Sequence, residues 1–266
     1  MTRIADAFVR ARSQGRAAFV AYITAGDPSP DATVGLAQAL ARAGTDVLEL
    51  GVPFSDPIAD GPVLQRAASR ALAAGTTLES VFEIARRIRG QTDMALVLFS
   101  YLNPVLRRGA RAATDARAAG FDGALVTDLP PEEAHWTQSH FRDAGLDTVF
   151  LVSPTSPPSR MAEAAKLSSG FLYVVSRSGT TGAREKLPRD LPQTVRRARS
   201  AAGRLPVAIG FGISTPEAAG RAASLADGVV VGSALVRAAE EAGGRREKAV
   251  ESLARSLALA CRRNPQ

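Results

Sequence analysis

The sequence predicts an α/β fold, specifically a (β/α)8 TIM barrel preceded by an additional N-terminal helix. Eight short apolar runs alternate with longer amphipathic ones along the 266 residues. The runs are rich in Val, Ile and Leu without strict alternation, as is typical of parallel strands covered on both faces. No polar linker divides the chain, so we expect residues 1–266 to form a single barrel domain. A doubly wound open sheet is the alternative, but eight evenly spaced units favour closure.

The first predicted element is a short amphipathic helix at the N-terminus, in which Ile4, Ala7, Phe8 and Ala11 recur at helical spacing. This segment lacks the continuous apolar region of a secretory signal. The eight predicted strands follow at 19–24, 46–51, 95–100, 123–127, 148–152, 171–175, 206–210 and 228–232.

Helix boundaries between the strands are predicted from capping residues. The apolar positions of residues 31–43 stop at Gly44, a residue typical of a helix end. Thr76 and Glu79 have the spacing of a capping box ahead of a helical pattern. Ser214 and Glu217 have the same spacing, and Pro216 between them suits the first turn of another helix.

The chain is basic, with a net charge of +7 and a pI near 10.4. Of the 33 basic residues only three are lysine, and the arginines are scattered in pairs among acidic residues. No basic stripe interleaved with aromatic residues is present, so we expect no nucleic-acid binding. No stretch has the apolar length of a membrane span, so no membrane partner is expected either.

The sequence contains one cysteine, Cys261, which excludes an intrachain disulfide framework and a thiolate metal site. A reducing cytoplasm is therefore the expected location. His135 and His140 are five residues apart, on different faces of a predicted helix, and no further metal-ligand set is apparent. We expect no metal.

The most informative segment is LELGVPFSDPIADG at residues 48–61, which contains Glu49, Asp56 and Asp60. Burying a carboxyl group in an apolar strand costs free energy, so its presence indicates a functional role, although a structural ion pair is the simpler alternative. Active sites of (β/α)8 barrels lie at the C-terminal ends of the strands. Glu49 and Asp60 both fall on that face, where two carboxylates with different pKa values could divide acid and base work.

Three glycine-rich turns follow late strands, at 176–182, 210–214 and 232–234. The loops after strands seven and eight of such barrels commonly hold a phosphate against a helix N-terminus. Gly212 and Ser214, and Gly232 and Ser233, fit that role, and Thr181 and Gly182 could close the site from the side. Residues 178–184 are interpreted as a lid, or alternatively as a flexible surface loop.

The segment LELGVPFSDPIADGP closely resembles the signature of the tryptophan synthase alpha chain family. The resemblance extends over nearly the whole chain, through AYITAGDP (21–28), YLNPV (101–105), VTDLPPEE (126–133), SRSGTTGAR (176–184), GFGIS (210–214) and GSALV (232–236). Departures are mild: Thr180 stands where an aliphatic residue is more common, and Tyr22 where Phe is common. The basic pI is also unusual for the family.

The resemblance implies a lyase that cleaves indole-3-glycerol phosphate to indole and glyceraldehyde 3-phosphate without cofactor or metal. It places Glu49 and Asp60 as the catalytic carboxylates and Tyr173 near the substrate. It places Gly182, Gly212, Gly232 and Ser233 on the phosphate. Candidates for contact with the rest of the substrate are Tyr22, Phe99, Leu125, Thr181 and Phe211. Aromatic and aliphatic residues at strand ends are otherwise ordinary core residues.

The resemblance also implies a pyridoxal-phosphate beta chain as partner, in an αββα complex that receives the indole. The implied docking residues are Pro53, Asp56, Pro57, Asn103 and Asp128, which are otherwise simple turn and cap residues. A stand-alone lyase that releases free indole, a non-catalytic scaffolding barrel, and a different sugar-phosphate barrel enzyme are the alternatives.

Overall fold

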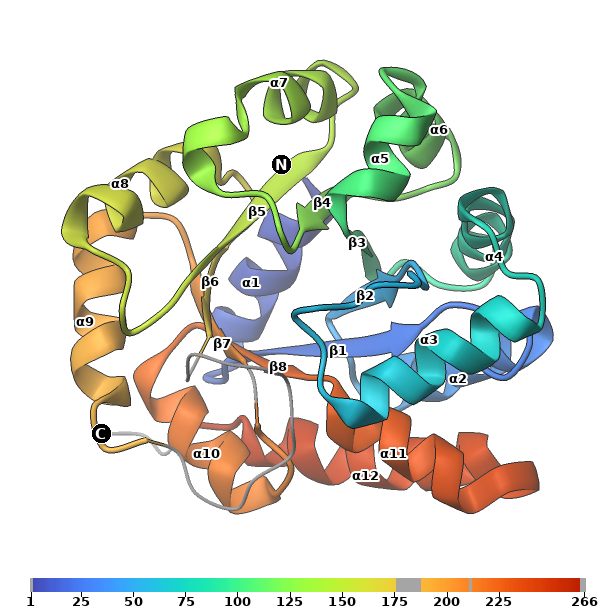
Figure 1. Cartoon of the computed structure of the whole chain (residues 1–266). Coiled ribbons are helices and arrows are strands. Elements are labelled where there is room, and N and C mark those ends of the chain that lie inside the picture. Colours follow the sequence, from blue (N-terminus) through green and yellow to red (C-terminus); the bar gives the residue numbers. More distant parts are fainter. Residues whose placement is uncertain (1, 176–187, 211, 264–266) are drawn as a thin grey trace.

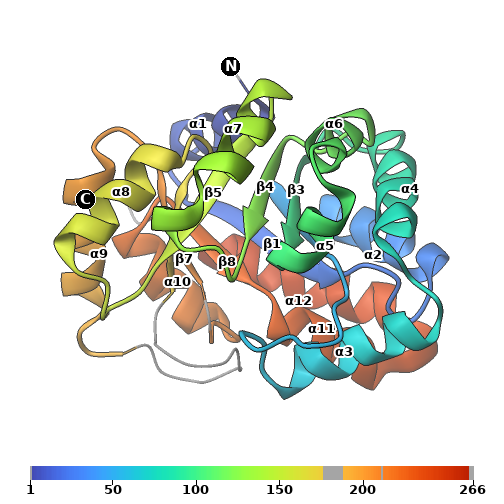
Figure 2. The same cartoon turned by 45° about the horizontal axis from the view of Figure 1, so that its top comes forward.

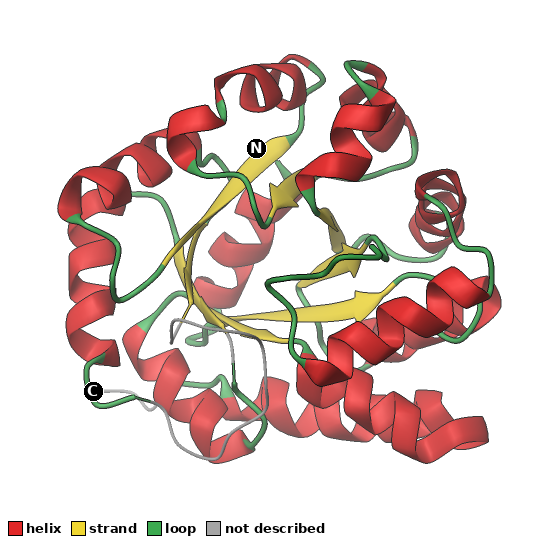
Figure 3. Ribbon diagram, viewed as in Figure 1, coloured by secondary structure: helices red, strands yellow, loops and turns green. Residues whose placement is uncertain are grey.

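A computed structural model describes residues 2–175, 188–210 and 212–263 of the chain. Its eight strands pair in parallel in chain order, and β8 pairs with β1, so the predicted barrel closes. Figure 3 shows the ring of strands inside a ring of helices. The strands are β1 (Ala18–Thr24), β2 (Val47–Gly51), β3 (Ala95–Ser100), β4 (Gly123–Val126), β5 (Asp147–Val152), β6 (Leu172–Val175), β7 (Val207–Gly210) and β8 (Gly228–Val231).

The helices lie outside the strands, with the exception of the first (Figures 1 and 2). They are α1 (Arg3–Ser13), α2 (Pro30–Arg42), α3 (Pro62–Ala73), α4 (Leu78–Arg89), α5 (Leu102–Arg108), α6 (Arg111–Ala118), α7 (His135–Asp143), α8 (Pro158–Leu167), α9 (Leu191–Ala202), α10 (Pro216–Leu225), α11 (Ser233–Ala242) and α12 (Arg246–Ala260), with 3-10 turns η1 (Pro131–Glu133) and η2 (Gly243–Arg245). None of the described helices is long and apolar enough to cross a bilayer.

The N-terminal helix α1 covers the end of the barrel at which the strands begin. Its four predicted apolar positions are all buried, and they belong to the same cluster as the side chains that fill the barrel interior. The Phe8 ring lies 5.4 Å from that of Phe171. A Cβ on Gly123 would lie 2.7 Å from Ile4 Cδ1 and 2.9 Å from the backbone carbonyl oxygen of Asp147, and this second contact with the backbone favours glycine where this helix meets β4.

Two predicted helix starts are wrong by one residue. The N-cap of α4 is Thr77, whose hydroxyl accepts from Ser80 N at 3.3 Å, and the capping box is Thr77 with Ser80. Thr76 is instead buried against Gly26 and packs the loop after β1. The N-cap of α10 is Thr215 and not Ser214, while Pro216 is in the first turn as predicted.

Carboxylates tie together the strand beginnings. Three aspartates that stand just before even-numbered strands each accept the backbone N–H of a residue at the start of the preceding strand: Asp46 from Phe19, Asp122 from Leu96 and Asp227 from Val207, at 2.8–3.0 Å. Each also pairs with arginine, namely with Arg16, Arg89 and Arg199 in turn. The hydrogen bonds join β1 to β2, β3 to β4 and β7 to β8 at the end of the barrel opposite the predicted active site, and the ion pairs balance the aspartate charges.

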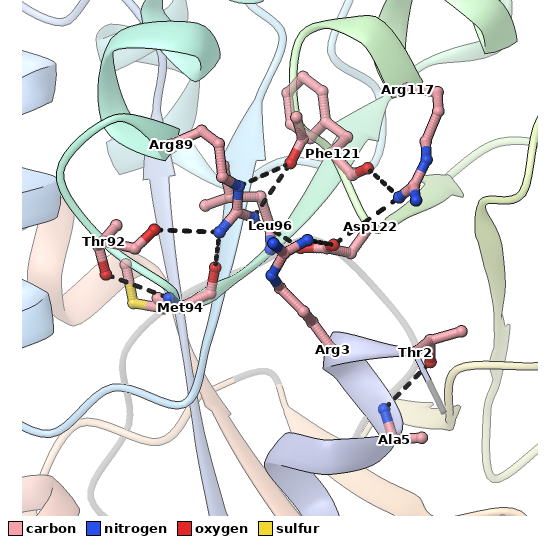
Figure 4. Close-up of polar contacts among 11 residues, drawn as sticks. Thr2, Arg3, Ala5, Arg89, Thr92, Met94, Leu96, Arg117, Phe121 and Asp122 are labelled. Carbon is pink, nitrogen blue, oxygen red and sulfur yellow. Dashed lines mark hydrogen bonds and ion pairs between the residues drawn. The ribbon is translucent and has the colours of Figure 1, made fainter.

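Asp122 is the most connected of the three (Figure 4). Its carboxylate lies 2.7 Å from Arg89 Nη2, 3.1 Å from Arg3 Nη1 and 3.9 Å from Arg117 Nη1. The Asp122 side chain is buried, and Arg89 also donates to three backbone carbonyls around it. This network joins α1, α4 and the start of β4.

Replacement of Asp122 with alanine should therefore destabilise the barrel. The variant leaves the half-buried Arg89 guanidinium without its anion, and loss of one partner of a buried pair costs about 3–5 kcal/mol. Urea unfolding followed by circular dichroism measures the change. Asp143→Ala removes an exposed carboxylate from α7 and should change stability by no more than about 0.5 kcal/mol. Equal effects of the two substitutions would contradict the structural role of Asp122.

Candidate active site

Glu49 is the middle residue of β2, in register with Tyr22 of β1 and Val97 of β3. The apolar sequence around it makes a strand that is buried on every residue, so its side chain is carried into the barrel. The side chain is 1 % exposed, and within the described part of the chain its Oε1 has no hydrogen-bond partner. Burial disfavours the carboxylate and raises the pKa of Glu49 to about 8. At neutral pH Glu49 is therefore mainly a neutral carboxylic acid.

Asp60 lies in the loop after β2, directly before Gly61, the N-cap of α3. Its side chain is also buried, and burial raises the pKa of Asp60 to about 6, while a hydrogen bond from Tyr101 opposes that rise. The Tyr101 hydroxyl donates to Asp60 Oδ2 at 3.2 Å and accepts from Ala59 N at 3.1 Å. Asp60 is therefore mainly a carboxylate at neutral pH, so the two acids are in opposite protonation states.

Both carboxylates line one pocket at the C-terminal ends of the strands. The pocket gathers eight of the predicted site residues: Tyr22, Glu49, Asp60, Phe99, Tyr173, Gly212, Gly232 and Ser233. Its remaining walls are Leu64 of α3, Ile213 after β7 and Val230 of β8, which the sequence did not single out. The pocket thus has an apolar lining with a few convergent polar groups, as small-molecule sites commonly do.

The two tyrosines of the pocket lie over glycines at strand ends. A Cβ on Gly51 would lie 2.2 Å from Tyr22 Oη, and one on Gly210 would lie 2.1 Å from Tyr173 Oη. The Tyr22 ring meets Phe99 edge-on at 5.1 Å. Burial raises the pKa of both tyrosines, so their hydroxyls stay neutral at the pocket.

The opposite wall of the pocket is a helix N-terminus. The N-cap of α11 is Gly232, which has no side chain to bond the first N–H groups of the helix, and Ser233 follows it. Gly212 has φ +89°, a conformation that favours glycine. Free N–H groups and the helix dipole make such an end suitable for an anion.

Some predicted site residues are not among the described residues that line the pocket. Leu125 is fully buried in the barrel interior and is not a wall of the pocket. Thr181, Gly182 and Phe211, and the segment interpreted as a lid, lie outside the described residues. Tyr101, by contrast, was missed as a site residue, although it opens the YLNPV segment directly after β3.

The predicted docking residues lie in the loops after β2 and β4 and, for Asn103, in the first turn of α5 after β3, on the same face as the pocket. Asp56, Asn103 and Asp128 are exposed, Pro57 is half-buried and Pro53 is buried within the chain. Asp128 also accepts from Leu102 N at 2.7 Å at the start of α5, which is the cap role considered as the alternative.

Removal of the Tyr101 hydroxyl should change the ionisation of Asp60. Tyr101→Phe keeps the ring, which stacks 5.1 Å from Phe54, but deletes a hydrogen bond that favours the Asp60 carboxylate. The pKa of Asp60 should rise, and activity at neutral pH should fall roughly 3–10-fold. Carboxyl-carbon NMR of Asp60 in the ligand-free chain measures this pKa directly, and an unmoved pKa would contradict the role of Tyr101.

Comparison with known proteins decides the family. The sequence profile described as tryptophan synthase alpha chain matches residues 8–262. The chain belongs to the tryptophan synthase alpha chain family. A relative of that name from Solibacter usitatus is 53% identical over 242 residues, which cover 91% of this chain and 90% of the relative. One from Opitutus terrae is 46% identical and covers 96% of both chains.

Solved structures of tryptophan synthase share the fold. The Mycobacterium tuberculosis tryptophan synthase superposes with a TM-score of 0.90 at 36% identity, over 99% of both chains. An alpha chain from Legionella pneumophila gives 0.89 at 38% identity, over 98% of this chain and 97% of that one. As a tryptophan synthase alpha chain, the protein is a lyase of tryptophan biosynthesis that cleaves indole-3-glycerol phosphate. Membership supports this function over the stand-alone and scaffolding alternatives.

Proposed function

We propose that Glu49 and Asp60 divide the proton transfer and charge stabilisation of indole-3-glycerol phosphate cleavage. The observation that carries this proposal is the pair of buried carboxyl groups in one pocket, with the pKa of Glu49 raised to about 8 and that of Asp60 to about 6. Environments that push two pKa values apart identify an acid and a base.

Glu49 is the proton shuttle in this proposal. The neutral acid gives its proton to C3 of the indole ring, which becomes tetrahedral. The bond between C3 and the glycerol carbon then breaks, and its electron pair restores the aromatic ring. The hydroxyl on that carbon loses its proton to the Glu49 carboxylate as the C=O of the aldehyde forms. Glu49 ends the cycle protonated, so no external acid or base is consumed.

Asp60 is the electrostatic partner. Protonation at C3 places positive charge on the indole nitrogen, and a carboxylate that accepts the N–H hydrogen bond stabilises it. The neutral hydroxyl of Tyr101 holds Asp60 in place. Tyr173 is proposed to orient Glu49, since both line the pocket.

Substrate binding is assigned to the remaining walls. The apolar residues Tyr22, Phe99, Leu64, Ile213 and Val230 suit the flat indole ring. Gly212 after β7, with Gly232 and Ser233 at the start of α11, is proposed to hold the phosphate. Gly182, Thr181 and Phe211 are proposed to complete the site, and Leu125 is proposed to support it from beneath. No cofactor is proposed, and no group of three metal-ligating side chains occurs in the described residues.

We further propose that the chain works with a tryptophan synthase beta chain in an αββα complex in the cytoplasm. Asp56, Asn103 and Asp128 are exposed beside the pocket, and Ile58 in the same loop as Asp56 is 76% exposed. Pro53 and Pro57 are proposed to fix the shape of that loop. A single buried cysteine, Cys261, is consistent with a reducing compartment.

The test is indole release from indole-3-glycerol phosphate by the purified chain, alone and with a tryptophan synthase beta chain. Slow release that rises strongly when the beta chain is added is the expected result. Fast release without a partner would contradict the dependence on a beta chain. No release in either case would contradict the chemistry assigned to Glu49 and Asp60.

A further inference from the structure

A second hollow lies at the opposite end of the barrel from the active-site pocket. It is a cavity of about 610 Å³ between α1, the end of α9 and the residues just before β7 and β8. Five arginines line it, and they come from three separate stretches of the chain: Arg12 and Arg16, Arg199 and Arg204, and Arg263. The one acidic residue in its wall is Asp227, and Asp46 pairs with Arg16 from outside the wall, so five arginines face two carboxylates and a formal surplus of three positive charges remains.

The carboxylates near this hollow, those of Asp227 and Asp46, are already engaged in ion pairs and hydrogen bonds. The Asp227 carboxylate accepts from Val207 N at 3.0 Å and from Arg199 at 3.1 Å, and it lies 3.6 Å from Arg263. Arg16 is bound by Asp46. Within the described residues, the side chains of Arg12 and Arg204 have no ion-pair partner, and both are exposed. Arg199 and Arg263 also donate to backbone carbonyls, so the guanidinium groups of Arg12 and Arg204 are the ones available to a ligand in the described part of the chain.

The same hollow also has apolar lining residues. Phe8 and Val9 of α1 line it together with Leu205 and Pro206, and Val9 is 41% exposed although it is a large aliphatic residue. A hollow lined by both guanidinium groups and apolar side chains suits a ligand that has an anionic end and an apolar body. A phosphate monoester offers several oxygens and about two negative charges, which suit two unpaired guanidinium groups better than a single carboxylate does.

We propose that this hollow is a binding site for a small organic phosphate with an aromatic or aliphatic body. It is separate from the catalytic pocket, because α1 and the filled barrel interior lie between the two. A bound ligand would join α1 to the segment before β7. Binding should accordingly raise the midpoint of thermal unfolding of the whole chain.

Phenyl phosphate is the probe, measured by isothermal titration calorimetry at low salt. The full chain carries Ser233→Asp, which places a carboxylate at the start of α11 and excludes the probe from the active-site phosphate position. One binding event should remain. Arg12→Gln with Arg204→Gln should weaken it roughly tenfold, since two exposed charges are removed.

The matched control is Arg107→Gln with Arg111→Gln, an exposed pair on α5 and α6. It removes the same charge and should leave the affinity within about twofold. Equal weakening by the two double variants would overturn the proposal, because it would show attraction by net charge alone. Absence of the binding event would also overturn it, as would equal affinity for inorganic phosphate, which lacks the apolar body.

Discussion

Glu49→Gln should lower kcat for indole formation by ~10²–10⁴-fold, because an amide of the same shape can neither donate nor recover the proton. KM should change little, since the apolar walls and the phosphate position stay intact. Steady-state indole formation in the presence of the beta chain measures both quantities. The substitution introduces no new charge at a side chain that is 1 % exposed, so the fold should be retained.

The control for this variant is Glu163→Gln on the outer helix α8, which makes the same chemical change away from the pocket. It should have activity close to that of the unmodified chain. Turnover of Glu49→Gln at the level of this control would refute the proton shuttle. Circular dichroism of both variants shows whether a fall in turnover comes from the lost proton transfer or from loss of folding.

Asp60→Asn should lower kcat by ~10²–10³-fold, a loss typical of removing one group that stabilises transition-state charge. Asparagine still accepts a hydrogen bond from Tyr101, so the loop geometry should be kept, but its neutral oxygen stabilises positive charge on the indole nitrogen far less. The inhibition constant of glycerol 3-phosphate reports the phosphate position and should stay within about threefold. A large loss of phosphate affinity with unchanged kcat would contradict the role given to Asp60.

The strand pattern of this chain could be predicted closely from sequence. Predicted strand 19–24 is Ala18–Thr24 in the structure, and 46–51 is Val47–Gly51. Runs of Val, Ile and Leu are typical of strands buried on both faces, and each run can be recognised from its own short stretch of sequence. The helix caps were less accurate, because Thr76 and Thr77 both fit the pattern and tertiary packing of Thr76 against Gly26 chooses between them.

The site could be predicted in part. The position of Glu49 and Asp60 at the active-site face follows from the location of such sites at the C-terminal ends of barrel strands. The phosphate role of the glycines in the late loops follows from the affinity of helix N-termini for anions. Tyr101 could not be found in this way, because its hydrogen bond to Asp60 joins residues 41 apart in the sequence. The opposite protonation states depend on how deeply each side chain is buried, which only the folded structure gives.

The most direct test of the acid and base assignment is the pH dependence of kcat/KM for indole release. Asp60 must be ionised, so activity should be lost as pH falls through about 6. Glu49 must be protonated, so activity should be lost as pH rises through about 8. The substrate phosphate also titrates near pH 6, so the alkaline limb decides. A fall above about pH 8 is the predicted result, and activity sustained to about pH 10 would contradict a protonated Glu49 as the catalytic acid.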